Sequence, residues 1–420
     1  MTSVVSGRTF GTDGLRGRAN VDIGPEVAMA LGNALVAVLG PRIAIARDTR
    51  PSGPMLVAAT IAGITTAGGE AIDLGVLPTS GLSAVVARLG LSGGVMVTAS
   101  HNPPADNGLK AVGATGAKLD EAERRAVEAR LDAPLDHAAI PGGVRLLVDA
   151  GERYVAAVLD AVPRGRWLAG HTIVVDSANG ASTGLAGRVL VALGARVVTL
   201  GDGDGSAINV GCGAMAPDAL VAAVAAHGAS AGIALDGDGD RGVLVTAEGT
   251  VLDGDALVWL CAAGSVVIGT IMSNGGLEAG LAARGITLQR TPVGDAHVAA
   301  AMRESGAAVG GEPSGHILFA DGLPTADGLV ATLRALHPDP GTLSARAASL
   351  PRFAQLNTAV RIATARIPLT NDIATALRSE GARVVVRASG TEPVVRLMVE
   401  HADADVARVG LERLRDALIG

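Results

Sequence analysis

Helix-like and strand-like segments alternate along the first third of this chain, and no other feature restricts its fold as strongly. Apolar side chains at Val27, Leu31, Leu35 and Val38 recur every three or four residues, which is the spacing of one face of an amphipathic helix over residues 25–39. Further segments follow in turn, at residues 43–46 (strand), 55–67 (helix), 71–74 (strand), 95–98 (strand) and 120–133 (helix). Such alternation is typical of a parallel sheet covered by helices, so the sequence predicts an α/β fold.

Three apolar runs end in similar turns, which indicates related units. Residues 95–97, 173–175 and 266–268 each precede a serine and an asparagine, and the three serines, Ser100, Ser177 and Ser273, lie 77 and then 96 residues apart. Those intervals are too long and too unequal for a short repeat. We therefore expect three related α/β mixed-sheet domains.

The end of the chain has a different pattern. Residues 384–387 and 394–399 are predicted strands, and residues 404–418 a helix, which indicates a smaller α+β domain. The Pro-, Gly- and Ala-rich stretch 132–143 places the first boundary near residue 148. The sequence thus predicts four domains, at residues 1–148, 149–250, 251–346 and 352–420.

Composition limits the classes of partner. The chain has 420 residues, which is too long for one compact core. Aromatic residues make up 1% and apolar residues 49%, so the cores must be filled by aliphatic side chains. The net charge of −7, without a basic cluster, argues against a nucleic-acid partner.

Neither cysteine pairing nor a membrane is expected. Cys212 and Cys261 have no second Cys or nearby His at ligand spacing and are predicted to be free thiols. Charged residues such as Arg8 and Arg16 interrupt any secretory signal. The longest uncharged apolar stretch, 256–272, has 17 residues and contains glycines, so a buried helix followed by a strand explains it better than a membrane span. We expect a cytoplasmic protein.

The segment Asp236-Gly-Asp238-Gly-Asp240-Arg241 is the strongest local motif. Carboxylates at i, i+2 and i+4, separated by glycines, can converge on one divalent cation. An EF-hand is excluded because its twelfth position would be Ala247 and the flanking residues predict strands. The alternative is a solvated acidic turn.

Ser100 follows a predicted strand, in the sequence Thr98-Ala-Ser-His101-Asn-Pro103. Strand ends are where open α/β sheets bind ligands, and a hydroxyl beside a metal ion is a candidate phosphoryl carrier. The alternatives are an ordinary Asn-Pro turn or a Ser-His hydrolase, but the pattern G-x-S-x-G is absent from the sequence.

Two later segments carry groups that suit a phosphorylated sugar. The first, residues 310–316, holds Glu312, Ser314 and His316, which can bond sugar hydroxyls. The second, residues 387–396, offers groups that can hold a phosphate: Arg387, Ser389, Gly390, Thr391 and Arg396. Each is otherwise an ordinary polar turn, and the turns at residues 10–17 and 47–50 are interpreted as structural when considered singly.

Taken in order, these segments resemble the α-D-phosphohexomutase superfamily over essentially the whole chain. The similar segments are FGTDGLRG (10–17), VMVTASHNPPADNGLK (95–110), DGDGDR (236–241), GGEPSGH (310–316) and RASGTEP (387–393). Within this superfamily, two segments are most similar to the bacterial phosphoglucosamine mutase branch: GTIMSNGGLE (269–278) and FGTDGLRGRAN (10–20).

The resemblance implies an intramolecular phosphotransferase with four domains around one cleft, the last of them of the TATA-box-binding-protein-like type. Ser100 would become a phosphoserine, one Mg²⁺ would be held by Ser100, Asp236, Asp238 and Asp240, and a hexosamine or hexose bisphosphate would act as activator. His101 and Lys110 would be the acid/base groups, with Arg16 and Arg241 facing the anionic centre. Glu312, Ser314 and His316 would bind the sugar, and Arg387, Ser389, Gly390, Thr391 and Arg396 the other phosphate.

The implied reaction interconverts glucosamine 6-phosphate and glucosamine 1-phosphate and feeds UDP-N-acetylglucosamine synthesis. The alternatives are a glucose or mannose phosphate mutase, and a catalytically weak phosphosugar-binding homologue. The last is motivated by departures from the family's usual residues, above all Ala296 where an Arg is usual. A metal-binding structural protein would leave Glu312 and Arg387 unexplained. The partner is a small phosphosugar, without nucleic acid or membrane, and the family also allows a homodimer.

Overall fold

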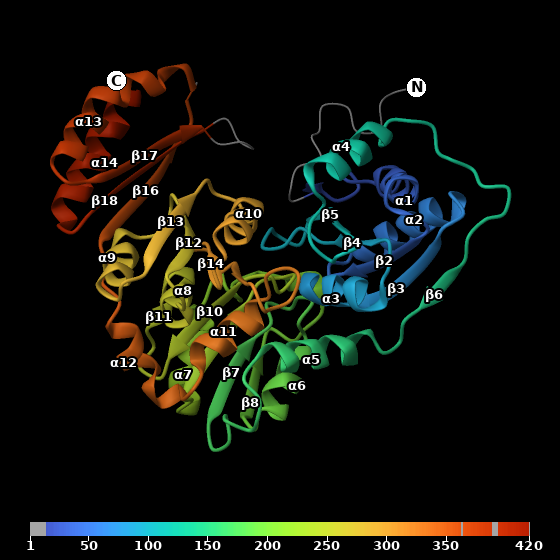
Figure 1. Ribbon diagram of the computed structural model, residues 1–420, viewed down its shortest axis with the longest axis horizontal. Coiled ribbons are helices and arrows are strands. Elements are labelled where there is room, and N and C mark those ends of the chain that lie inside the picture. The colour runs from blue at the N-terminus through green and yellow to red at the C-terminus, as the bar shows by residue number, and fades with distance from the viewer. Residues whose placement is uncertain (1–13, 363, 389–393, 420) are drawn as a thin grey trace.

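The computed structural model describes residues 14–362, 364–388 and 394–419. Figure 1 shows four sheets arranged along the chain, with the first sheet at one end of the molecule and the last sheet at the other. The sheets have six, five, four and three strands. The predicted domain bounds stay a prediction, although β11 (Val251–Leu252) pairs with a strand of the second sheet just beyond residue 250.

The first sheet is mixed, with the strand order β1-β5-β4-β2-β3-β6. Its strands are β1 (Leu15–Arg18), β2 (Arg42–Arg47), β3 (Glu70–Val76), β4 (Gly93–Val97), β5 (Asp106–Gly113) and β6 (Val144–Leu146). Its helices are α1 (Pro25–Leu39), α2 (Gly53–Thr66), α3 (Thr79–Leu89) and α4 (Glu121–Arg130). The predicted strands β2, β3 and β4 are parallel, and β5 runs antiparallel between β4 and β1, so the sheet is mixed, as expected.

The second and third sheets repeat the theme of parallel strands with an antiparallel edge. The second has the order β11-β10-β9-β7-β8 and the third β13-β12-β14-β15. The remaining strands of the second sheet are β7 (Thr172–Asp176), β8 (Arg196–Leu200), β9 (Ala231–Leu235) and β10 (Gly242–Thr246), with helices α5 (Ala150–Ala161), α6 (Leu185–Ala192) and α7 (Asp218–His227). The third has β12 (Val266–Thr270), β13 (Thr287–Thr291), β14 (Val309–Gly311) and β15 (Ile317–Phe319), with helices α8 (Gly254–Cys261), α9 (Gly275–Ala283), α10 (Asp295–Ser305), α11 (Gly328–Leu336) and α12 (Leu343–Ala348).

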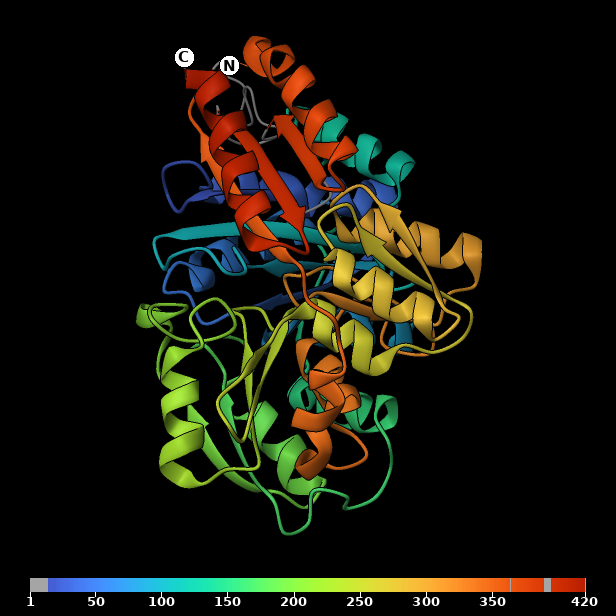
Figure 2. The same cartoon turned by 90° about the vertical axis from the view of Figure 1, so that its left-hand side faces the viewer.

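The last sheet is entirely antiparallel, as expected for a separate α+β unit. β18 (Val395–His401) lies between β16 (Ala354–Val360) and β17 (Arg383–Ala388) in the sheet. Along the chain, helix α13 (Asn371–Ser379) lies between β16 and β17, and helix α14 (Ala404–Ile419) follows β18. Both helices contribute to an apolar cluster with this sheet, and in Figure 2 they lie on one of its sides. The other side of the sheet is left for contacts with the rest of the molecule.

One apolar cluster joins the first three sheets, whereas the fourth has its own. A buried polar contact reinforces this junction: Asp327, which caps α11, accepts hydrogen bonds from Ser80 Oγ of α3 at 2.5 Å and from Tyr154 Oη of α5 at 3.0 Å. Helices of three different units thus meet at one carboxylate. This contact fixes α3, α5 and α11 relative to one another.

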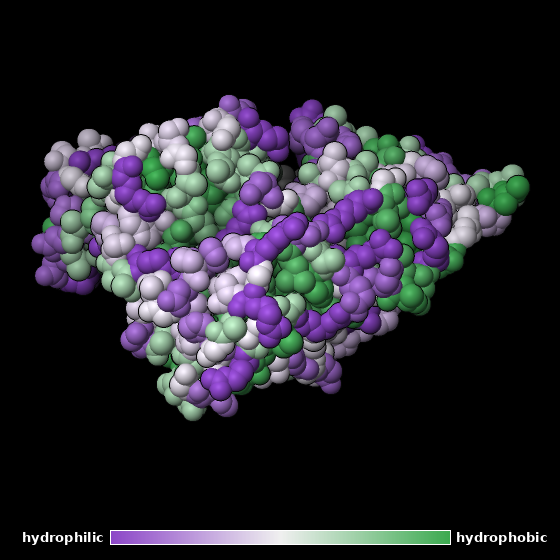
Figure 3. Space-filling view, turned by 60° about the horizontal axis from the view of Figure 1, so that its bottom comes forward, coloured by the Kyte–Doolittle hydropathy of each residue, from purple (hydrophilic) through white to green (hydrophobic). Residues whose placement is uncertain are grey.

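One group of exposed apolar side chains lies at the outer edge of the first sheet. Ile140, Val144, Leu146 and Val148 are exposed there, and apolar residues are visible at the corresponding end of Figure 3. Within the described residues, no helix is long and apolar enough to cross a membrane. In the same residues, Cys212 and Cys261 are free thiols, as predicted.

Candidate active site

Ser100 lies where β4 ends, on a loop whose backbone is held in an unusual conformation. Its φ is +52°, a left-handed value that L-residues seldom adopt outside functional loops, and the residue is buried. Its Oγ donates a hydrogen bond to Asp236 Oδ2 at 2.7 Å. Two segments 136 residues apart in the sequence therefore meet through the hydroxyl.

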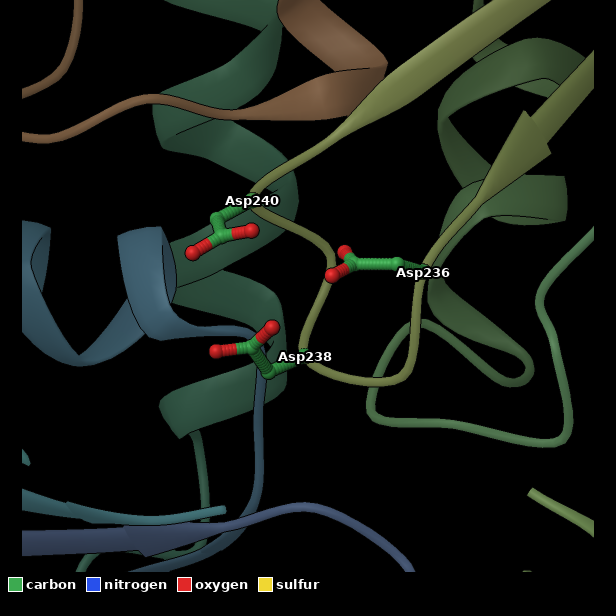
Figure 4. A group of neighbouring side chains, drawn as sticks. All are labelled: Asp236, Asp238 and Asp240. Atoms are coloured by element: carbon green, nitrogen blue, oxygen red, sulfur yellow. The ribbon is translucent and has the colours of Figure 1, made fainter. Parts of the chain in front are cut away.

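The three aspartates lie on the tight turn between β9 and β10, as the sequence predicts. Gly239 has a φ of +73°, which lets the turn curl. One oxygen of each carboxylate lies within 4.8 Å of the others, and Figure 4 shows the three side chains gathered around the turn. Burial, together with Asp240 and Asp238, raises the pKa of Asp236 well above its usual value. A carboxylate cluster of this kind needs a positive charge beside it.

Lys110, on β5, supplies part of that charge. Its Nζ lies 2.5 Å from Asp238 Oδ2 and 3.3 Å from Asp240 Oδ2. Burial acts to lower the pKa of Lys110, but the two aspartates outweigh it and raise the pKa above its usual value. Lys110 is therefore an ammonium ion at neutral pH.

His101 lies on the other side of the serine, with its Nδ1 3.4 Å from Ser100 Oγ. Burial and the neighbouring charges of Arg241 and Arg16 lower the pKa of His101 to about 4. Its imidazole is therefore neutral at pH 7. Arg16 and Arg241 thus both act electrostatically on the residue next to Ser100.

The site contains buried polar atoms that lack partners. Among the described residues, no hydrogen bond reaches Asp238 Oδ1, Asp240 Oδ1, Arg16 Nε or Arg241 Nε. Leaving such atoms unpaired is costly, which indicates that both a cation and an anion complete the site. Carboxylate oxygens are the donors that hard divalent cations prefer, and the three aspartates fit such an ion.

His316 connects the three-aspartate turn to the third sheet. Its Nδ1 lies 3.8 Å from Asp240 Oδ2, and its Nε2 lies 3.2 Å from Asp295 Oδ2. Asp295, at the start of α10, also pairs with Lys118 Nζ at 2.7 Å. Burial acts to lower the pKa of His316, but Asp240 and Asp295 raise it to about 10, so this histidine is a cation.

Glu312 and Ser314 lie on the loop after β14, next to these groups. Glu312 Oε1 accepts a hydrogen bond from the Gly294 N–H at 3.0 Å. Burial acts to lower the pKa of Arg241, but the three aspartates and Glu312 outweigh it and raise the pKa above its usual value. Gly315 has a φ of +90°, and a Cβ there would lie 2.2 Å from the Gly242 carbonyl oxygen. The loop is therefore packed directly against the strand that leaves the three-aspartate turn.

Arg387 and Arg396 lie on the fourth sheet, directly opposite each other on β17 and β18. They line a hollow of about 370 Å³ together with Asn357, Thr358 and Met272. Ser389, Gly390 and Thr391, which were also predicted to bind phosphate, lie outside the described residues. The described residues of this predicted phosphate site, Arg387 and Arg396, thus lie on the last sheet, apart from the group around Ser100.

Sequence reasoning missed several contributors. Arg50, interpreted singly as a turn residue, is fully buried behind the serine loop, and Asp295 and Lys118 pair with each other next to His316. The signal for Arg50 was present, because the turn 47–50 follows the end of β2, the strand next to β4. Asp295 and Lys118 lie 177 residues apart, and no local pattern predicts their meeting.

Comparison with known proteins gives the same assignment. Three family models match: "Phosphoglucomutase/phosphomannomutase, alpha/beta/alpha domain I" over residues 7–136, alpha/beta/alpha domain III over residues 253–338, and the C-terminal domain over residues 344–417. A phosphoglucomutase/phosphomannomutase family protein from Burkholderia thailandensis, solved by crystallography, superimposes with a TM-score of 0.79 at 28% identity, over 97% of this chain and 96% of that one.

Two relatives extend over nearly the full chain. The phosphoglucosamine mutase of Moorella thermoacetica is 41% identical over 98% of this chain and 100% of its own length. That of Frankia casuarinae is 41% identical over 97% of both chains. Together with the family models and the grouping of Ser100 with the three aspartates, this similarity shows that the chain belongs to the phosphoglucomutase/phosphomannomutase family of the α-D-phosphohexomutase superfamily.

Proposed function

We propose that this protein interconverts glucosamine 6-phosphate and glucosamine 1-phosphate, a step that supplies UDP-N-acetylglucosamine synthesis. The observation that carries the proposal is the buried Ser100 hydroxyl, 2.7 Å from an aspartate of a three-aspartate turn, in a chain 41% identical to phosphoglucosamine mutases. This grouping suits phosphoryl transfer, in which charge neutralisation and positioning matter most.

Ser100 Oγ is the proposed phosphoryl carrier. The bond from phosphorus to Oγ breaks as a bond forms from phosphorus to the free sugar hydroxyl, whose proton passes to a nearby base, and a sugar bisphosphate results. The bisphosphate then turns over in the site. Ser100 Oγ then attacks the phosphorus at the other end and loses its own proton. The bond from that phosphorus to the sugar oxygen breaks, the sugar oxygen takes up a proton, and the monophosphate product leaves.

The charges around Ser100 suggest separate roles for its neighbours. His101, neutral and 3.4 Å from Oγ, is the better candidate for accepting the proton. Lys110 keeps its proton and serves as a fixed positive charge or as an acid. Arg16 and Arg241, whose Nε atoms donate no hydrogen bond within the described residues, would bond the phosphoryl oxygens.

Ser100, Asp236, Asp238 and Asp240 are the proposed ligands of one Mg²⁺. When bound, the ion would neutralise the phosphoryl oxygens and polarise the phosphorus. Glu312, Ser314 and His316 would bind the sugar hydroxyls. The remote phosphate would be held by Arg387 and Arg396, with Ser389, Gly390 and Thr391 as further proposed contacts.

A panel of substrates tests the function. Wild-type protein is assayed with glucosamine, glucose and mannose 6-phosphates, each with a trace of the matching 1,6-bisphosphate as activator and with Mg²⁺. We expect the highest kcat/KM for glucosamine phosphate and no turnover by Ser100→Ala. Ser177→Ala is the matched control, because Ser177 is an equally buried serine after the corresponding strand β7, and this variant keeps its activity.

Each other outcome has a meaning. A preference for glucose or mannose phosphate would replace the proposed substrate with the alternative one. Turnover of none of the three sugars would contradict the mutase proposal and favour a phosphosugar-binding homologue.

A further inference from the structure

A buried arginine outside the assigned site holds the backbone of the serine loop. Arg50 lies just after β2, and its side chain is completely buried. An arginine offers five N–H donors in a rigid planar fork, and a charge buried this deeply is costly unless every donor is paired. Where those five donors point therefore indicates what the side chain does.

All five donors form hydrogen bonds, one with Asp48 and four with the serine loop. Arg50 Nε donates to Asp48 Oδ2 at 2.9 Å. The two terminal nitrogens donate to four backbone carbonyls of the segment that carries the serine, those of Ser100 (2.9 Å), Asn102 (2.7 Å), Pro103 and Asp106 (2.9 Å). The guanidinium thus bonds the loop from its reacting residue to the start of β5.

The same carboxylate also supports the serine from its other side. Asp48 Oδ2 accepts a hydrogen bond from Thr98 Oγ1 at 2.6 Å, and Thr98 Oγ1 accepts one from the Ser100 N–H at 2.9 Å. Both the N–H and the C=O of Ser100 are therefore fixed by a chain of bonds that includes Arg50 or its partner. This accounts for the left-handed backbone of Ser100, a conformation that persists only where its surroundings enforce it.

A second donor reaches the loop from the neighbouring unit. Asn209 Nδ2 donates to the carbonyls of Ser100 at 2.8 Å and Asn102 at 3.1 Å, and its own backbone N–H bonds Ala178 O at 3.0 Å. Two carbonyls of the serine loop are therefore bonded by Arg50 and by Asn209 together. The loop is pinned between the first and the second sheet.

We propose that Arg50 is a positioning residue that holds Ser100 Oγ at the three-aspartate turn, and that Asn209 assists it. The inference rests on the proposed function, because it assigns Arg50 a role in the phosphoryl transfer of Ser100. It touches neither substrate nor the reacting atoms. Its loss should therefore misplace the hydroxyl without removing a contact to the substrate.

Arg50→Lys is the principal test. A lysine keeps the charge but has three donors and no planar fork, so it cannot reproduce the five bonds. We expect kcat for the preferred phosphosugar to fall by about 10²-fold, the effect of a misplacement of about 1 Å, while KM changes little. The rate at which a sugar 1,6-bisphosphate phosphorylates Ser100, followed by intact mass, should fall in parallel.

Arg346→Ala is the matched control for loss of an arginine that bonds backbone carbonyls. Arg346 donates to the carbonyls of Ala335, Leu336 and His337, away from the serine loop. We expect this variant to melt at a lower temperature but to keep the wild-type kcat. A further readout is chemical rescue: ethylguanidinium at millimolar concentration should raise the kcat of Arg50→Ala and leave that of Arg346→Ala unchanged.

The outcomes separate the two proposals. If the wild type is active and a folded Arg50→Lys variant has the wild-type kcat, the positioning role is overturned and the proposed function stands. If the wild type is inactive, both the proposed function and the positioning role are contradicted. If the Arg50 variants do not fold, the Asn209→Ala variant tests whether the loop contacts position Ser100. A several-fold loss of kcat at unchanged KM supports the inference, and a wild-type kcat overturns it.

Discussion

Asp238 illustrates, at the scale of one residue, how the two oxygens of a carboxylate can have different roles. Its Oδ2 accepts hydrogen bonds from Lys110 Nζ at 2.5 Å and from Thr79 Oγ1 at 2.7 Å, while its Oδ1 is buried with no hydrogen-bond partner among the described residues. Burial acts to raise the pKa of Asp238, but the charge of Lys110 keeps it below its usual value. The residue is therefore an anion with one oxygen held in place and the other available to a cation.

Asp238→Asn should weaken the response to Mg²⁺. The amide removes one of the charges that bind a hard cation, so the Mg²⁺ concentration for half-maximal activity should rise by about tenfold or more. Asp202→Asn, an exposed change, is the control and should leave the titration unchanged. An Asp238→Asn protein with the wild-type Mg²⁺ response would show that this turn does not hold the ion.

Local spacing explains which site residues could be predicted. The i, i+2, i+4 aspartates converge because the turn itself is local, so their sequence is sufficient to predict their grouping. The bond between Ser100 and Asp236 depends on how two sheets pack, and the sequence supports it only through the family resemblance. The pairing of Asp295 with Lys118 depends on the same packing and was missed.

At the scale of helices and strands, periodicity works where one face is apolar. Helix α1 has the predicted bounds, Pro25–Leu39, because its stripe is regular and Gly40 ends it with a φ of +121°. Strand β5 was missed, since Asp106–Gly113 begins with Asp, Asn and Gly and includes Lys110, which is buried only because the aspartates pair with it. Helix α3 was missed for a related reason, because almost all of Thr79–Leu89 is buried and shows no polar face.

Asp255, in the first turn of α8, gives a pH-dependent prediction. Its Oδ2 accepts the Asn274 N–H at 2.8 Å, and burial and the nearby Asp253 raise its pKa from 3.8 to about 6. The folded state then holds a proton that the unfolded state loses between those pH values. The free energy of unfolding therefore falls as the pH rises through this window, by about 3 kcal/mol once the pH is above 6.

Asp255→Asn should remove that pH-dependent term. We expect the free energy of unfolding of this variant, minus that of wild type, to be about 2 kcal/mol higher at pH 7 than at pH 4.5, as measured by urea denaturation. Glu304→Gln, an exposed change on α10, should show no such difference. A pH-independent effect of Asp255→Asn would mean that the carboxyl is ionised throughout.

At the scale of the whole molecule, a polar junction attaches the fourth sheet to the third unit. Glu400 accepts hydrogen bonds from Arg383 at 2.9 and 2.8 Å and from the Gly275 N–H of α9 at 2.9 Å. Arg383 also donates to Ser273 O at 2.8 Å, so the last sheet is bound to the loop between β12 and α9. Figure 1 shows that this sheet and the first sheet lie at opposite sides of the molecule.

A phosphate clamp on that remote sheet should affect binding more than chemistry. Arg387→Ala removes a proposed charged contact to the phosphate that is not reacting. KM for the phosphosugar should therefore rise, and the fall in kcat/KM should correspond to roughly 2–4 kcal/mol of lost transition-state binding. Arg408→Ala, on the outer helix α14, is the control and should leave KM unchanged. A wild-type KM in Arg387→Ala would show that the hollow on this sheet is not the phosphate site.

The transfer of phosphate from Ser100 to the sugar is the central claim, and a single-turnover experiment measures it directly. Protein phosphorylated on Ser100 with a ³²P label is mixed with unlabelled glucosamine 6-phosphate and Mg²⁺ and quenched at intervals. We predict that the label leaves the protein at a rate no slower than kcat and appears in glucosamine bisphosphate and then in glucosamine 1-phosphate. Label that stays on the protein, or is released only as inorganic phosphate, would contradict the account.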